Sequence, residues 1–199
     1  MITTDLNWSR IAEWAERIAD DDLSPVQAIY DKHSLPAPIV VWDPPEESLM
    51  PEPLGFLLGH WRSLARETGM PHWRQIDPVN LGPALGYVML VEPVDNGRDF
   101  LCRLYGSMLA GISGFDMTGK YISQLKASAY VVEFSVATYR AAWRRRIPVF
   151  TTRHPADAVA TTAWQRIIMP LADDHGALAR FLVGNVPVDR EGRIIRAPY

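Results

Sequence analysis

The chain has 199 residues, of which 48% are hydrophobic, and a formal net charge of −3 at neutral pH. This length suits one domain, or one domain with an extension, and the hydrophobic share predicts a packed core rather than disorder. The acidic balance disfavours a general nucleic-acid binder, and no apolar run approaches the roughly 18 residues that cross a bilayer.

The first third of the chain is predicted to be helical and then irregular. Residues 5–20 form an amphipathic helix, because apolar side chains recur there at helical spacing: Trp8, Ile11, Ala15 and Ile18. A second short helix begins at Ser24, which is followed by proline at the first helical position, and it fades near His33. The proline-rich stretch 35–53 is predicted to be an irregular surface segment or a linker. The acidic N-terminal region lacks an apolar stretch, so we expect no signal peptide.

The middle of the chain predicts a helix and then a hairpin. Residues 54–67 carry one apolar stripe at helical spacing. Residues 85–92 are dense in strand-forming residues, and a second strand follows at 99–105. Between them, Asp95-Asn96-Gly97 is a strong tight-turn signal.

The last part predicts helices followed by strands. A short helix is expected at 107–113 and the longest helix at 127–146. Three strands complete the chain, at about 148–154, 162–171 and 177–187. Because hairpins join most neighbouring strands, we expect one antiparallel sheet with helices grouped on a face, an α+β architecture.

Five short pieces of sequence carry a family resemblance: HWRSL at 60–64, MPHWRQIDP at 70–78, FLCRLYGSML at 100–109, FDMTGK at 115–120 and MPLADD at 169–174. In this order they resemble a PAS domain, and more narrowly a compact bacterial PAS family, over about residues 55–185. The resemblance implies a five-stranded antiparallel sheet, helices on its concave face, and a role in sensing or protein contact. We therefore expect an N-terminal helical extension with a proline-rich segment over 1–53, and a PAS-like domain over 54–199.

The cofactor stays open. Flavin-binding PAS photosensors carry a reactive cysteine on a helix, whereas Cys102 lies on a predicted strand. Haem-binding PAS proteins use a helical histidine, and the helix 127–146 contains none. Cys102 is instead expected to be a packed core residue. As the single cysteine it cannot form an intramolecular disulfide, which favours a reducing cytoplasm.

A structural ion pair is expected on the predicted strand 99–105. Alternation places Arg103 opposite the apolar set of that strand, where the N-terminal helices would cover it. A covered arginine needs a carboxylate, and Asp77 is our candidate. This pair would dock the N-terminal segment rather than bind a ligand.

A ligand site is expected between the sheet and the long helix. Its candidate lining is aromatic, sulfur-containing or titratable: Tyr130, Phe134, His154, Trp164 and Met169. The alternative is that these side chains fill a solid core. No pair of the five histidines has metal-ligand spacing, and we find no catalytic motif, so neither a metal site nor a catalytic residue is predicted.

A group of arginines allows two interpretations. Arg140, Arg144, Arg145, Arg146 and Arg153 could bind an anionic partner, or they could form a solvated helix end. The acidic overall balance favours the second interpretation.

The sequence therefore favours a non-enzymatic sensor or interaction module in signalling that binds a small apolar molecule. The alternatives are a small-molecule enzyme using the same cavity and a ligand-free structural interaction domain. We expect a separate signalling partner protein. Trp8 and Trp14 suggest that the helix 5–20 makes a homodimer contact or covers the outer face of the sheet.

Overall fold

A six-stranded sheet forms the centre of the fold. The computed structural model describes residues 5–66, 69–154 and 163–196. The strands lie in the order β1-β4-β5-β6-β2-β3, and every neighbouring pair is antiparallel. Their bounds are β1 Ile39–Trp42, β2 Val88–Val94, β3 Asp99–Tyr105, β4 Val149–Arg153, β5 Ala163–Ala172 and β6 Leu178–Val188.

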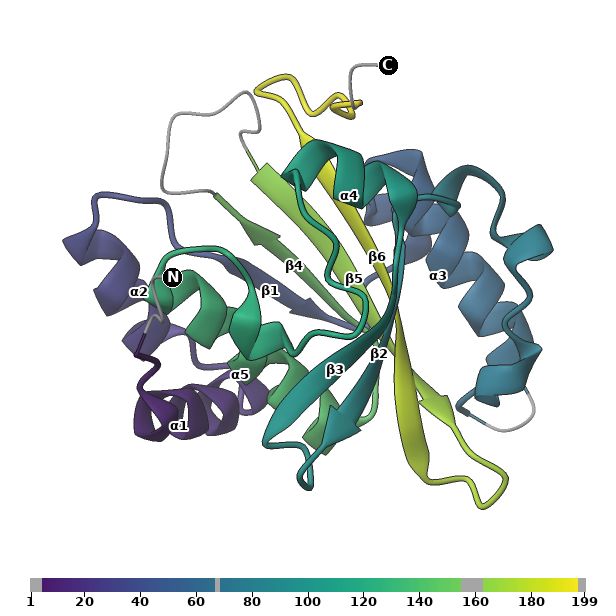
Figure 1. Ribbon diagram of the computed structural model, residues 1–199, viewed down its shortest axis with the longest axis horizontal. Coiled ribbons are helices and arrows are strands. Elements are labelled where there is room, and N and C mark those ends of the chain that lie inside the picture. Colours follow the sequence, from purple (N-terminus) through teal and green to yellow (C-terminus); the bar gives the residue numbers. More distant parts are fainter. Residues whose placement is uncertain (1–4, 67–68, 155–162, 197–199) are drawn as a thin grey trace.

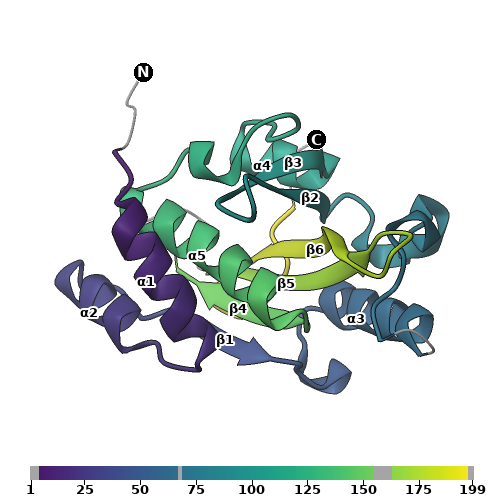
Figure 2. The ribbon, with the colours of Figure 1, turned by 90° about the horizontal axis from the view of Figure 1, so that it is seen from below.

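Helices cover both faces of the sheet (Figures 1 and 2). On one face lies α5, which contacts β3 and β5, and α1 packs against α5. On the other face α3 packs on β5 and β6, where the bare backbone of Gly184 meets Leu54 and Leu57. The α-helices are α1 Trp8–Ala19, α2 Ser24–Lys32, α3 Glu52–Ala65, α4 Ser107–Ser113 and α5 Ala129–Arg145. Four short 3-10 helices are also present among the described residues: η1 Glu46–Ser48, η2 Trp73–Gln75, η3 Pro78–Ala84 and η4 Ile122–Gln124.

The expected α+β architecture is confirmed. The strand at 99–105 and the short helix at 107–113 have the predicted bounds. The hairpin forms because Asp95, Asn96 and Gly97 all adopt positive φ, as a tight turn requires. The predicted ends at residues 67 and 162 lie outside the described residues. None of the described helices is long and apolar enough to cross a membrane.

The expectation of five strands and an irregular proline-rich segment is wrong. β1 lies inside that segment and pairs with β4, which makes the sheet six-stranded. The local cause is the run Ile39-Val40-Val41-Trp42, which lies between Pro38 and Pro44 and contains no proline. Because β1 is an edge strand with one neighbour, the surrounding prolines do not interrupt a second ladder.

The helix α1 is anchored to α5 by a buried carboxylate. Glu133 is fully buried and accepts a hydrogen bond from the backbone N–H of Asn7 at 2.8 Å and another from Nε of Arg10 at 2.8 Å. Trp14 is 1% exposed, and the guanidinium groups of Arg98 and Arg140 lie 5.1 and 5.8 Å from the ring centroid of Trp8. Since α1 packs on α5, it does not form the expected cover on the outer face of the sheet.

The arginines at the end of α5 also bind α1 rather than solvent alone. Arg144 pairs with Glu16, and Nη1 of Arg145 lies 2.9 Å from Oδ2 of Asp21. The interpretation as a solvated helix end is therefore incomplete, because these side chains also contact α1 and the turn after it through partly exposed ion pairs.

The predicted pair between Asp77 and Arg103 is not formed. Arg103 is exposed and makes two hydrogen bonds to Glu92 on the neighbouring strand, at 2.6 and 3.2 Å. Asp77 instead accepts a hydrogen bond from the backbone N–H of Val79 at 3.0 Å, which caps η3. The prediction failed because α1 and α2 pack at α5 and leave this end of β3 uncovered.

Candidate functional site

A cavity of about 330 Å³ lies between α5 and the face of the sheet that α5 covers. The segment from α4 through η4 closes one side of it, and strands β2 to β6 all contribute side chains. Its wall is mainly apolar where that segment and α5 meet, and includes Ile112, Phe115, Met117, Ile122, Leu125 and Val131.

The floor and the far end of the cavity are polar. Two neighbouring strands contribute Arg153 and Arg166, and α5 contributes Ser135 and Tyr139. Exposed Lys126 also lines it, so the described lining carries three cationic side chains. No aspartate, glutamate or histidine is among the described residues of this lining.

The cavity raises or lowers the pKa of its titratable groups through burial. Loss of solvent and, to a smaller extent, the positive charge of Arg166 lower the pKa of Arg153 to about 10. Burial also lowers the pKa of Arg166. Burial raises the pKa of both Tyr105 and Tyr139. An arginine side chain stays protonated at neutral pH even when it is buried, and both tyrosines are neutral there.

The structure brings only Trp164 of the predicted ligand-binding residues to this cavity. Tyr130 and Phe134 are buried against Tyr30 of α2, with ring centroids 5.2 and 6.2 Å from it. Met169 is fully buried, and His154 directly follows β4 without lining the cavity. A ligand-binding role for these four side chains stays a prediction.

Local geometry explains this separation. Along β5, Trp164 and Met169 are an odd number of residues apart, so the alternation of the strand places them on opposite faces of the sheet. Along α5, the cavity-lining residues are Val131, Ser135 and Tyr139. The first two each directly follow one of the predicted residues, Tyr130 and Phe134. All three, with both arginines, are functional candidates that the sequence did not identify as cavity residues.

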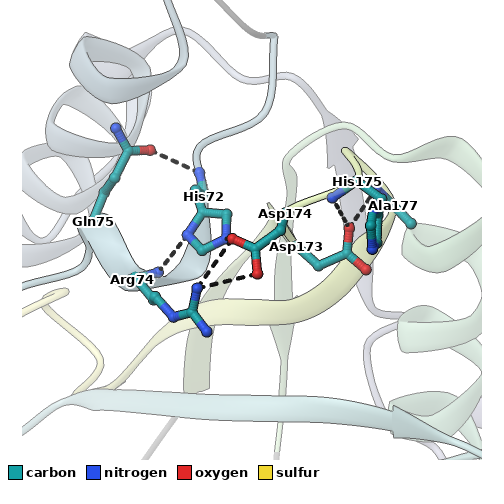
Figure 3. A network of polar contacts seen from close by, with 7 residues as sticks. All are labelled: His72, Arg74, Gln75, Asp173, Asp174, His175 and Ala177. Carbon is teal, nitrogen blue, oxygen red and sulfur yellow. Dashed lines mark hydrogen bonds and ion pairs between the residues drawn. The ribbon is translucent and has the colours of Figure 1, made fainter.

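The polar network of Figure 3 lies away from this cavity and is structural. His72 and Arg74, beside and within η2, both contact the carboxylate of Asp174 after β5, with Nε2 of His72 at 3.1 Å and Nη1 of Arg74 at 3.0 Å. Gln75 accepts a hydrogen bond from the backbone N–H of His72 at 2.7 Å. Asp174 is 64% exposed on its side chain, so these contacts orient two loops and contribute little stability.

Two of the family-like pieces meet at this network. MPHWRQIDP contributes His72 and Arg74, and MPLADD contributes Asp174. The piece HWRSL also reaches MPLADD, because Trp61 Nε1 donates a hydrogen bond to the carbonyl of Pro170 at 2.8 Å. The three pieces therefore meet in space, at contacts that join α3 and the loop containing η2 to the end of β5.

Comparison with protein families decides the classification. The family model of the PAS domain matches residues 51–185, about two thirds of the chain. The chain belongs to the PAS domain family. No curated protein and no solved structure matches it. The PAS match includes α3, all of β2 to β5 and most of β6, so it contains every described residue that lines the cavity.

Proposed function

We propose that this PAS protein is a non-enzymatic sensor or interaction module in signalling, and that it binds a small molecule in the cavity between α5 and the sheet. The observation that carries the proposal is the cavity itself. A volume of about 330 Å³ lies at the lower end of the range for small-molecule sites. It corresponds to roughly ten non-hydrogen atoms, if each takes about 30 Å³ as in liquid water.

Binding is favoured over catalysis by the kinds of titratable group that meet there. Proton-transfer chemistry needs a base, and its pKa is best near the working pH. The described lining instead offers cationic arginines and tyrosines whose pKa is raised by burial. These groups donate hydrogen bonds and orient a ligand, which is the work of a binding site.

The long helix α5 connects the cavity to α1, because it contacts both. Val131 and Ser135 face the cavity, whereas Glu133 lies between them in sequence, on the opposite side of the helix, and holds α1. We propose that a ligand which shifts α5 changes how α1 docks, and that a separate partner protein or a second copy of the chain reads this change.

Native mass spectrometry of freshly purified protein tests ligand binding. We expect an additional mass in the native spectrum that is lost on denaturation. Ser135→Met should abolish it, because an unbranched side chain projecting from α5 fills part of the cavity. Ser63→Met is the matched control, since Ser63 also donates to a carbonyl of the preceding helical turn but is exposed on α3. A protein that carries no ligand, and that no compound in a small-molecule library stabilises against heat, would contradict the proposal.

A further inference from the structure

Two arginines lie side by side on the floor of the cavity. In the antiparallel register of β4 and β5, Thr151 is opposite Arg166 and Arg153 is opposite Trp164. Arg153 and Arg166 are therefore diagonal neighbours on the same face of the sheet, within reach of one common ligand. Both belong to the described lining of the cavity.

Arg166 is buried with unused hydrogen-bonding capacity. The residue is 8% exposed, and its Nε donates a hydrogen bond to Oγ1 of Thr151 at 3.3 Å. Both its Nη2 and the hydroxyl of Tyr139 are buried, and neither makes a hydrogen bond of good geometry with another described residue. The guanidinium lies over the ring of Tyr139, with Cζ 5.1 Å from the ring centroid.

No carboxylate balances these charges within the described part of the chain. The ion pairs found there include neither Arg153 nor Arg166. Arg153 has instead the ring of Trp164, with Cζ 5.9 Å from its centroid. A ring face stabilises a cation only in part, and the charge of Arg166, which is buried, is costly when no counter-charge lies beside it. The two arginines therefore form a candidate anion-binding site, in which an anion would supply the missing counter-charge.

We propose that the cavity binds a small organic acid whose carboxylate contacts Arg153 and Arg166 while its apolar body lies against Ile112, Phe115 and Val131. This inference rests on the proposed function and names the ligand class for it. The planar guanidinium fork matches a carboxylate with two parallel hydrogen bonds. Lys126, exposed beside the cavity, adds a positive charge that attracts the acid.

The test compares an acid with its uncharged counterpart. We choose 3-phenylpropanoate and 3-phenylpropanamide, which have the same shape and differ in charge, and titrate each into the full chain by calorimetry. We expect the acid to bind at least about tenfold more tightly than the amide, because charge-assisted hydrogen bonds to a buried guanidinium are strong. Equal affinities for acid and amide would overturn the inference and leave the proposed function standing.

Arg166→Met identifies the residue responsible. This variant should lose at least about tenfold in affinity for the acid and should bind the amide as before. Its melting temperature without ligand should not fall, because the substitution removes an unbalanced buried charge and keeps an unbranched apolar side chain. Arg103→Met is the matched control, since it removes an exposed arginine outside the cavity.

Two other outcomes, an unfolded Arg166→Met variant and probes that do not bind, also test the inference. If Arg166→Met unfolds, Arg166→Lys keeps the cation but loses the fork, and we expect it to weaken acid binding while leaving the amide unaffected. Acid affinity that survives both substitutions would overturn the inference. If neither probe binds at millimolar concentration, the inference is wrong for an acid of this size. If the native spectrum then also shows no ligand, the proposed function fails separately.

Discussion

The buried contact between α1 and α5 permits a quantitative test of how the N-terminal helix is held. Removing Arg10 by Arg10→Met leaves Glu133, which is fully buried, with the backbone N–H of Asn7 as its remaining partner. Breaking a buried ion pair from one side costs about 3–5 kcal/mol, and the surviving charged hydrogen bond reduces this to about 2–3 kcal/mol. Glu133→Gln should cost less, about 1–2 kcal/mol, because the Arg10 side chain is 31% exposed and can be hydrated.

The double variant separates this contact from general damage. With both charges removed, Arg10→Met with Glu133→Gln should cost about 2 kcal/mol, at least about 1 kcal/mol less than the sum of the single variants. Urea unfolding followed by tryptophan fluorescence measures all three, since the chain has seven tryptophans. Arg17→Met is the control on the same helix. The Arg17 side chain is 50% exposed and that of its partner Asp22 is 34% exposed, so the loss should be smaller than that of Arg10→Met. Additive losses within about 0.5 kcal/mol would refute the coupling.

Two further predictions concern the core. Burial raises the pKa of the Cys102 thiol to about 12, so at pH 8 its thiolate fraction, and hence alkylation by iodoacetamide, should be at least about 1,000-fold lower than for a free cysteine of pKa about 8.5. As pH rises from about 8.5 towards 12, the thiol of Cys102 ionises in the unfolded state before it does in the folded state, so the free energy of unfolding should decline over this range. Rapid alkylation of the native protein would contradict the buried placement of Cys102. Gly184→Ala should lower the free energy of unfolding, measured in urea, by about 1–3 kcal/mol, since its Cβ would lie 2.8 Å from Cδ2 of Leu54. Gly176→Ala is the control, because Gly176 has positive φ but open space around it, so this variant measures the backbone effect alone. An unchanged stability of Gly184→Ala would show that α3 is not packed against this position.

The sequence predicted helices and strands well where clear turn-forming residues lie between them. Asp95-Asn96-Gly97 indicated the hairpin between β2 and β3, because few residues tolerate positive φ. The strand β1 was missed because prolines on both sides outweighed four strand-forming residues, Ile39 to Trp42. Pairing with β4 stabilises that short run, and pairing between distant segments cannot be read from local pattern.

The candidate site was harder to predict than the fold. The first three turns of α5 are buried on every side, from Tyr130 to Tyr139, so periodicity could not indicate which face borders a cavity. The same limit applied to Arg153, which was grouped with the arginines of the preceding helix end although its strand places it in the cavity. A sequence signal did exist in β5. Arg166 stands in an otherwise mostly apolar run, and a charge at such a position indicates a buried polar function.

The first three turns of α5 are buried on every side, and this has a consequence for how a ligand could act. The helix contacts the cavity through Ser135 and Tyr139 and holds α1 through Glu133, so it cannot move at one contact without straining the other. A ligand can shift this balance only by as much as its affinities for the two positions of α5 differ. An acid that binds Arg166 contacts the sheet directly and reaches α5 through that side chain, because the guanidinium lies over the ring of Tyr139. Ligand binding in the cavity would therefore change the position of α5 through this contact, and the docking of α1 on α5 would change at the surface.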